Sequence, residues 1–504
     1  MYVRVLKHKN GRSYIQVIEK RGGKYVVRKS FGSGNTPEAV QKLKLTADRW
    51  VANQTGLQEF DFVGERELFN KLLDNISSLK LVGIEFTLGR LFDEIGFNNI
   101  EDELFRHLVL YRLVYPKSKL KTTEYLYRYE GKQYSEDEIY RYMDKLHNKQ
   151  KDRVQQISYA HTLSLFPKGI QVVFYDVTTV YFEIDQEDEL RKTGFSKEGK
   201  HENPQIVLGL LVSRDGYPLA YDIFEGNKFE GHTMMPVIDG FKQKYNLEQL
   251  IIVADSGLLS RSNIEQLQEQ NYEFILGARI KNESTSIKDK ILTLQLKNGE
   301  SAVINKGDLR LIITYSDKRA EKDQYNRKKG INRLSKQIRS GRLTKDHINK
   351  RGYNKFLRME GQINLVLDQH QIAQDKKWDG LKGYLTNSKL NKDQLIENYQ
   401  HLWQIEKAFR VAKTELKLRP VFHRRQRRIE AHICLNFAAY KVYKELERFL
   451  KENKSSLSPQ KVIEIAQNIH QIELTTPTTK DVLKKTIILS EEQKDIERLF
   501  QFGC

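Results

Sequence analysis

The spacing of apolar residues divides the first third of the chain into a strand-rich start and a long helical stretch. Within the first 35 residues, runs of β-branched and aromatic residues are separated by Asn10-Gly11 and Gly22-Gly23, a pattern that predicts strands joined by hairpins. From residue 36 to about 158 the apolar residues recur at helical spacing, and Ser135 and Glu138 have the spacing of a capping box. The expected strands are residues 3–7, 13–19 and 25–29.

From Gly169 the pattern changes to short apolar runs separated by turns and helices. Two of the runs end abruptly in an aspartate, Val-Val-Phe-Tyr before Asp176 and Leu-Ile-Ile-Val-Ala before Asp255. Asp215-Gly216 lies between two other runs and predicts a hairpin. Strands and helices in this order predict an α/β core with a mixed sheet. The expected strands are residues 170–175, 205–213, 217–224, 250–254 and 272–276, and the expected helices are 233–245 and 262–270.

A segment of different texture interrupts this core. Residues 316–358 hold fifteen Lys and Arg against four Asp and Glu, which is typical of a phosphate-binding surface or of a mobile surface loop. Further strands are expected at 291–296, 309–315, 363–368 and 383–385, and long helices at 391–418 and 429–450. The expected divisions are 1–35, an N-terminal β-hairpin region; 36–160, a helical DNA-binding region; 165–280, the first part of the core; 281–370, a β-rich basic insertion; 371–450, the second part of the core with its long helix; and 451–504, a C-terminal helical tail.

The net charge of +19 changes the picture, because so basic a protein repels itself unless its partner is a polyanion. Nucleic acid is the favoured partner. A membrane is not expected, since no apolar run approaches the roughly 18–20 residues that a span needs. With only Cys434 and Cys504, the chain has neither a disulfide framework nor a cysteine zinc site, which is consistent with the cytoplasm.

Asp176 and Asp255 are the first candidate site residues. Each follows an apolar run, and ligands of open α/β sheets gather at the carboxyl ends of the strands. If the two strands are neighbours, the carboxylates converge on one point. Two ordinary turn aspartates explain the pattern equally well at this stage.

A third carboxylate is expected on the helix at 391–418. Tyr399, Glu406 and Lys413 are spaced by sevens, so they share one face of a helix, about 90° from the apolar stripe that contains Ile405 and Phe409. Such a flank is usually only solvated surface. Beside two aspartates, however, Glu406 would complete the ligand set of a divalent-metal site.

Three short motifs accompany these candidate residues. They are Tyr-Asp-Val-Thr at 175–178, Ala-Asp-Ser-Gly at 254–257 and Asp-Gly-Leu-Lys-Gly-Tyr-Leu-Thr-Asn at 379–387. With them the chain resembles the DDE transposases of bacterial insertion sequences, most closely the insertion-sequence-four superfamily. In that superfamily the catalytic helix carries Tyr, two residues, Arg, three residues, Glu, six residues and Lys. Tyr399, Glu406 and Lys413 match this spacing, whereas Leu402 stands at the Arg position and Arg410 follows one turn after Glu406.

The resemblance implies a fold, an activity and a cofactor. The fold is α/β: a ribonuclease-H-like mixed-sheet core interrupted by a β-rich insertion, with an N-terminal strand-plus-helix DNA-binding region and a helical C-terminus. Asp176, Asp255 and Glu406 would be both the catalytic residues and the ligands of two Mg²⁺ ions, for which Mn²⁺ substitutes. The chain would cut at the ends of its element and join them to target DNA.

The expected partner is double-stranded DNA, both the terminal inverted repeats and the target, bound by a homodimer in a synaptic complex. Two alternatives stay open: a ribonuclease-H-like nuclease without strand transfer, and a non-catalytic DNA-binding protein derived from a transposase. The expected DNA contacts are Tyr399, Arg410 and Lys413 on the helix and Arg424, Arg425, Arg427 and Arg428 beyond it.

Overall fold

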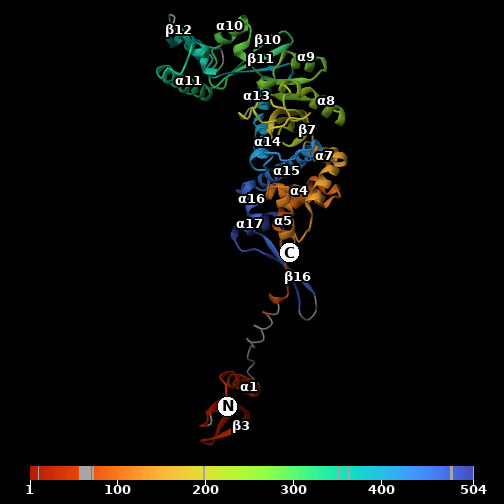
Figure 1. The fold of residues 1–504 in the computed structure, drawn as a ribbon, viewed down its shortest axis with the longest axis vertical. Helices are drawn as coiled ribbons and strands as arrows, with labels where there is room; N and C mark the ends of the chain where they lie inside the picture. Colours follow the sequence, from red (N-terminus) through yellow and green to blue (C-terminus); the bar gives the residue numbers. More distant parts are fainter. Residues whose placement is uncertain are drawn as a thin grey trace. The chain divides into compact units, whose positions relative to one another are not determined.

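The computed structural model describes residues 1–9, 11–55, 70, 73–196, 199–349, 352–360, 364–476 and 481–502. The chain forms two compact units, drawn in Figure 1. One contains Met1–Leu79 and Ile472–Lys485, and the other contains Lys80–Gln471 and Thr486–Cys504. Asn10, Ile363, Cys504 and residues 350–351 of the basic run, which enter the predictions above, lie outside the described residues. No helix in the described ranges is long and apolar enough to cross a membrane.

The first unit begins with an antiparallel sheet of β1 (Tyr2–Lys7), β2 (Ser13–Arg21) and β3 (Lys24–Gly34). Helix α1 (Pro37–Thr55) packs on this sheet, and Ile15, Val17 and Ala47 form the small core between them. The strands expected within the first 35 residues are therefore confirmed. A further three-stranded sheet has the order β16-β15-β4 and contains β4 (Ile76–Leu81), β15 (His470–Thr475) and β16 (Val482–Ile487).

The second unit is built on an eight-stranded mixed sheet, as the alternation of strands and helices predicts. Its strand order is β10-β11-β14-β9-β8-β5-β6-β7. Strand β8 runs parallel to both of its neighbours, β5 and β9. All other neighbouring strands in the sheet are antiparallel. The bounds are β5 (Val172–Tyr181), β6 (Gln205–Ser213), β7 (Pro218–Glu225), β8 (Ile251–Ala254), β9 (Glu273–Ala278), β10 (Ser301–Lys306), β11 (Leu309–Tyr315) and β14 (Leu381–Thr386).

Helices cover both faces of this sheet with apolar cores. One core includes α8 (Met234–Tyr245) and α9 (Arg261–Glu269). The other core surrounds α15 (Gln426–Glu452), which is buried over most of its length and lies between the sheet and the helical region, as Figure 1 shows. That region contains α3 (Arg90–Ile95), α4 (Glu103–Val114), α5 (Lys119–Glu130), α6 (Glu136–Lys145) and α7 (Lys151–Ser164), followed near the C-terminus by α16 (Pro459–Ala466) and α17 (Glu491–Phe500).

One local prediction is confirmed and one is wrong. The capping box of Ser135 and Glu138 is present at the start of α6. The tail 451–504, expected to be helical, instead contains β15 and β16 between its helices, because the alternating Ile-Glu-Leu-Thr pattern suits a strand.

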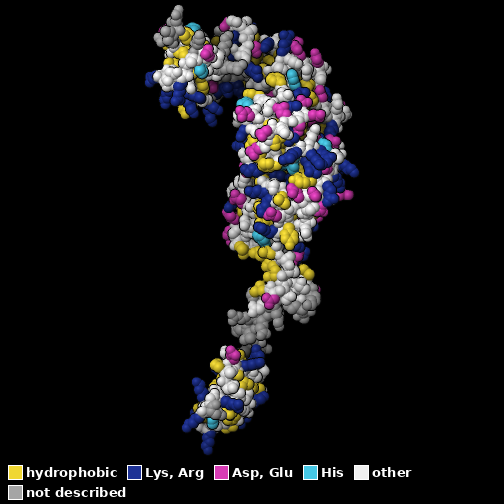
Figure 2. Space-filling view, viewed as in Figure 1, with side chains coloured by type: hydrophobic (Ala, Val, Ile, Leu, Met, Phe, Trp, Pro, Cys, Tyr) yellow, Lys and Arg dark blue, Asp and Glu magenta, His cyan; other side chains and the backbone are white. Residues whose placement is uncertain are grey.

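The insertion at 281–370 contains both helices and strands. The strand expected at 291–296 is wrong: α10 (Thr285–Thr293) includes residues 291–293, and residues 294–296 form neither helix nor strand. The N-terminus of α10 is capped by the Ser284 side chain. The first part of the basic run forms a long helix, α11 (Asp317–Arg339), rather than a loop, and Figure 2 shows Lys and Arg side chains gathered over it. The segment also contains β12 (Leu357–Glu360) and β13 (Asn364–Leu367), and α12 (Gln369–Lys376) follows it.

The single helix expected at 391–418 is also wrong, since the chain forms α13 (Lys392–Gln400) and α14 (Trp403–Thr414). At the junction the Leu402 N–H donates to the Tyr399 carbonyl and the Gln404 N–H to the His401 carbonyl, three residues back instead of four. This tighter turn lets Tyr399, Leu402 and Ile405 all reach the same core. Helix α15 begins at Gln426, three residues before the predicted start.

Candidate active site

The register of two parallel strands brings Asp176 and Asp255 together. The sequence predicted that the strand ends at Asp176, but β5 continues to Tyr181 because β-branched residues follow the aspartate. The pairing of β5 with β8, however, ends where Tyr175 lies opposite Ala254. The next residue on each chain is the aspartate, so the two occupy equivalent positions on neighbouring strands, which are about 4.8 Å apart.

Both aspartates lie on the sheet face that α14 covers. Phe174 and Val253 belong to the core that includes α14, whereas Tyr175 and Ala254 belong to the core on the opposite face. Asp255 keeps an extended backbone, with φ −74° and ψ 163°. Because side chains alternate along extended chain, Asp176 and Asp255 return to the face of Phe174 and Val253.

Helix α14 supplies the third carboxylate. It packs against β5 and β6 through Ile405, Ala408 and Phe409, and Glu406 stays exposed beside this buried stripe. Asp255 is exposed and Asp176 is half-buried. The three carboxylates predicted from the sequence therefore come from β5, the end of β8 and the first turn of α14, all on one face of the sheet.

Tyr399 connects α13 to this face. Its buried hydroxyl donates to Asp255 Oδ1 over 3.4 Å, and burial together with the Asp255 charge raises its pKa. The close approach requires a glycine on β9. A Cβ at Gly277 would lie 2.5 Å from the Tyr399 hydroxyl oxygen and 2.9 Å from the Ser256 backbone nitrogen.

Lys382 on β14 is a candidate site residue that the sequence analysis missed. Its Nζ lies 4.4 Å from the centre of the Tyr399 ring and 5.3 Å from that of the Tyr384 ring. Burial and the charge of Arg319 lower the Lys382 pKa, while the negative charges of Asp255 and Glu406 oppose that shift. The signal was present in the 379–387 motif, but only the strand order places this lysine near the carboxylates.

Lys382 also borders a cavity of about 710 Å³ between β9, β14 and the insertion. Two further cations on its wall, Arg279 and Arg319, come from the end of β9 and from α11. Several charges that line the cavity are paired, since Asp375 accepts from Lys281 at 2.8 Å and from Lys355 at 2.6 Å, and Arg319 Nε lies 3.8 Å from Asp323 Oδ2. Lys382, Arg279 and Arg319 therefore bring three cations to this cavity, and Asp323 offsets part of the Arg319 charge.

Comparison with known proteins identifies the family of the chain. A family model described as a transposase DDE domain matches residues 167–442, more than half of the chain and the part that holds all three carboxylates. The chain belongs to this transposase family. No curated protein matches the chain. Assignment to the insertion-sequence-four superfamily stays a prediction.

Solved transposase structures are similar to the chain at low identity. A piggyBac transposase synaptic complex with hairpin DNA is 10% identical, with 76% of this chain and 79% of that chain covered and a TM-score of 0.38. A Mos1 transposase paired-end complex with the left transposon end is 11% identical, with coverage of 31% and 53% and a TM-score of 0.16. A Mos1 mariner paired-end complex with Mn is 12% identical, with coverage of 31% and 54% and a TM-score of 0.15.

The expected DNA contacts differ in their exposure. Arg410 is exposed and Lys413 half-buried on α14. Arg424 and Arg425 are exposed in the connector before α15, where the sequence predicted them. Leu402, at the position of the family Arg, is buried in the core and only 7% exposed, so it contacts no phosphate.

Arg427 and Arg428 lie in the first turn of α15 rather than in a connector. Both contact the Asp144 carboxylate, Arg427 Nε at 2.9 Å and Arg428 Nε at 3.0 Å, and the Arg428 guanidinium lies 4.5 Å from the centre of the Tyr140 ring. A shared carboxylate offsets part of their charge. These two arginines therefore join α15 to α6, and Arg424 and Arg425 are the better candidates for DNA.

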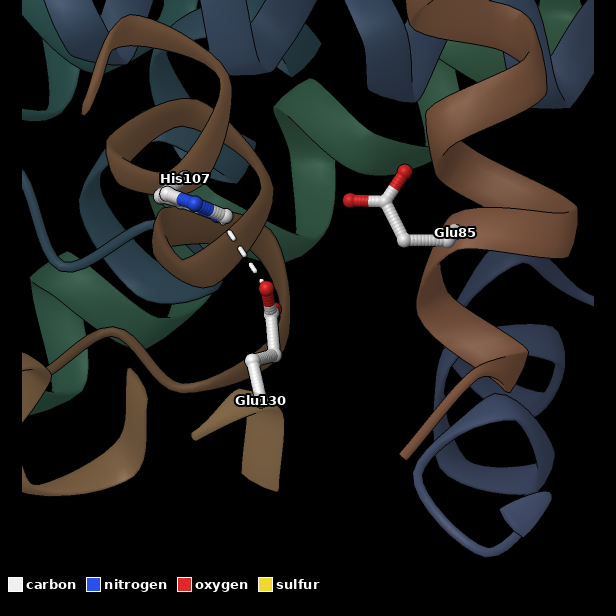
Figure 3. Close-up of side chains that lie close together, drawn as sticks. All are labelled: Glu85, His107 and Glu130. Atoms are coloured by element: carbon white, nitrogen blue, oxygen red, sulfur yellow. Dashed lines mark ion pairs between the residues drawn. The ribbon is translucent and has the colours of Figure 1, made fainter. Parts of the chain in front are cut away.

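A second group of potential metal ligands lies in the helical region, away from the DDE residues. Among the described residues, Glu85, His107 and Glu130 are the group of three whose ligand atoms all lie within 4.8 Å of one another. Figure 3 shows the Glu85 carboxylate facing the pair of His107 and Glu130, which are 3.4 Å apart. Burial raises the pKa of Glu130 to about 7 and lowers that of His107, and Arg106 already pairs with Glu85 at 2.5 Å. Arg106 offsets the Glu85 charge, and burial disfavours the charged forms of His107 and Glu130, so the cluster connects η1 (Glu85–Gly89), α4 and α5 without needing a metal ion.

Proposed function

We propose that the chain is a DNA transposase that cuts at the ends of its insertion sequence and joins them to target DNA, with Asp176, Asp255 and Glu406 as its catalytic carboxylates. The register of β5 and β8 supports this proposal, because it gives the aspartates of two separate strands equivalent positions on neighbouring strands. Helix α14, packed on the same face, adds Glu406.

The chemistry of these ligands fits Mg²⁺ or Mn²⁺. All three are hard carboxylate oxygens, which these ions prefer over the nitrogen and sulfur ligands of zinc. Two are exposed and one is half-buried, so DNA and ions can reach them. When bound, a pair of divalent ions supplies charge stabilisation to the attacking and leaving oxygens of a phosphodiester.

The surrounding residues orient the carboxylates and hold the DNA. Tyr399 donates to Asp255 and restrains that side chain. Lys382, held against the Tyr399 ring, takes the phosphate-binding role that Leu402 cannot fill, because its ammonium group lies in the field of Asp255 and Glu406. Arg410, on the helix of Glu406, extends the positive surface along the DNA backbone, and Lys413, two turns after Glu406, would contact a phosphate near the scissile bond.

The test is a cleavage and joining assay with end DNA of the element, with and without Mg²⁺. Asp176→Ala, Asp255→Ala and Glu406→Ala should each abolish cleavage and leave DNA binding largely intact. Asp308→Ala, which removes an exposed carboxylate from the β10–β11 turn, is the matched control and should cleave normally. Near-normal cleavage by any triad variant would refute the assignment of that residue.

The same assay separates the alternatives. Cleavage by the wild-type chain without joining would indicate a nuclease, and binding without cleavage would indicate a non-catalytic DNA-binding protein. A homodimer bound to two element ends should migrate more slowly in a gel than a complex with a single end. The stoichiometry of the complex can be measured by light scattering.

A further inference from the structure

A positively charged pocket lies in the helical region, where the α4–α5 turn meets the connector between α14 and α15. Its volume is about 370 Å³. Arg112 comes from the end of α4, Lys119 from the first position of α5, and His432 from α15. Lys417 and Phe422 of the connector lie at its border. None of these residues belongs to the DDE site.

Two of the cations that line the pocket, Arg112 and Lys119, are buried without a counter-charge. Arg112 is 6% exposed and Lys119 is 5% exposed. Among the residues that the structure describes, no hydrogen bond or ion pair joins either side chain to a carboxylate, and Arg112 Nε has no hydrogen-bond partner. The other buried cations are partnered: Arg191 by Asp188, Arg327 by Asp379, Lys441 by the Ser158 carbonyl and Lys444 by Glu447.

Burying an ion without a partner costs several kcal/mol, and this cost is visible in the pocket. Burial lowers the pKa of Arg112 to about 10, and burial together with Arg112 lowers the pKa of Lys119 well below its ordinary value. Burial, Lys119 and Arg112 lower the pKa of His423 to about 3. Each group disfavours the charge of the next, and an anion between them would reverse this effect.

The remaining donors match a tetrahedral oxyanion. Helix α5 begins at Lys119, and its Lys121 N–H already donates to the Ser118 hydroxyl, so the N–H groups of Lys119 and Leu120 are those left for an anion at this helix start. The one carboxylate at the border, Glu136, accepts a hydrogen bond from Tyr140 at 2.7 Å. Phe422 is 75% exposed beside the pocket and offers a ring for a base to stack on.

We propose that this pocket binds a phosphate group, held by Arg112, Lys119 and the N-terminus of α5. Resting on the proposed transposase function, the natural source is the backbone of the bound DNA. A phosphate in the pocket would tie the DNA to the connector that follows α14, and therefore to the helix that carries Glu406.

The first arm of the test uses inorganic phosphate and the thermal unfolding of the full chain. Phosphate should raise the Tm of the wild type by several degrees relative to chloride of equal ionic strength. Lys119→Met and Arg112→Met should abolish this rise, and their Tm in chloride should not fall, because each removes an uncompensated buried charge. Lys441→Met is the matched control: it removes a buried lysine that has partners, so it should lower the Tm and keep the phosphate response.

The second arm identifies the source of the phosphate. If it is DNA, Lys119→Met should weaken binding of a duplex by about tenfold, as expected for a lost charge-assisted phosphate contact, while Lys441→Met should not. Loss of the phosphate response with unchanged DNA affinity would assign the pocket to a free phosphate compound. An equal phosphate response in the wild type and Lys119→Met, or none in either, would overturn the proposal. Asp255→Ala should keep the phosphate response, so failure of the proposed catalytic site would be seen separately.

Discussion

Replacing Gly277 by alanine tests the candidate active site most sharply. A Cβ on Gly277 would lie 2.5 Å from the Tyr399 hydroxyl oxygen, whereas ordinary van der Waals contact begins at 3.4 Å. One of the two groups must therefore retreat by about 0.9 Å. The Tyr399 ring is packed against Tyr384, with ring centres 4.6 Å apart, and beneath the Lys382 ammonium group, so its retreat is restricted.

The displacement falls on Asp255. The same Cβ would lie 2.9 Å from the Ser256 nitrogen, which belongs to the peptide bond after Asp255. The Tyr399–Asp255 hydrogen bond is 3.4 Å long and would lengthen beyond a useful distance. A misplacement of about 1 Å in a catalytic group costs about a hundredfold in rate, which corresponds to about 2.7 kcal/mol of transition-state stabilisation.

The assay is single-turnover cleavage of end DNA in Mg²⁺, with equilibrium binding of the same DNA. Gly277→Ala should cleave about a hundredfold more slowly and bind with unchanged affinity. Gly240→Ala is the matched control, because a Cβ on Gly240 in α8 meets nothing within 4 Å. Adding Tyr399→Phe to Gly277→Ala removes the clashing oxygen and should recover part of the rate. Wild-type cleavage by Gly277→Ala would refute the reasoning, since Tyr399 and Asp255 would then not define the reacting geometry.

Three further changes test other parts of the molecule. Lys382→Met and Lys413→Met should each lower the single-turnover cleavage rate about tenfold or more with little change in DNA affinity. The reason is that cations near the carboxylates act on charge that develops in the transition state. Equal losses of rate and affinity would contradict this role. Arg424→Gln should instead weaken DNA binding and flatten its salt dependence while the bound complex cleaves normally, and an unchanged salt slope would exclude a phosphate contact. Burial raises the pKa of Glu130 from 4.5 to about 7, so the wild type loses stability as the pH rises through that window. Between pH 4 and pH 8, the free energy of unfolding of Glu130→Gln, measured in urea, should therefore gain about 3 kcal/mol relative to that of the wild type. A gain independent of pH would show that this carboxyl group is not responsible.

Much of the fold could be predicted from the sequence because strands and helices leave local patterns. The runs at 205–213 and 309–315 coincide with β6 and β11, and the capping box at Ser135 begins α6. The candidate site residues Asp176, Asp255 and Glu406 were also identified from the sequence. The two aspartates directly follow apolar runs, and Glu406 lies beside an apolar helical stripe. All three belong to motifs that resemble those of a known family.

The tertiary structure alone decided how these pieces meet. The proximity of Asp176 and Asp255 depends on the pairing of β5 with β8, and nothing local encodes a pairing between segments so far apart. The break between α13 and α14 came from burying Tyr399, Leu402 and Ile405 in one core, although an unbroken helix satisfies the same spacing. Lys382 likewise reaches the carboxylates only because β14 pairs with β9 in the middle of the sheet. Periodicity reports which side of an element is buried, but which elements share that burial is set by contacts between distant parts of the chain.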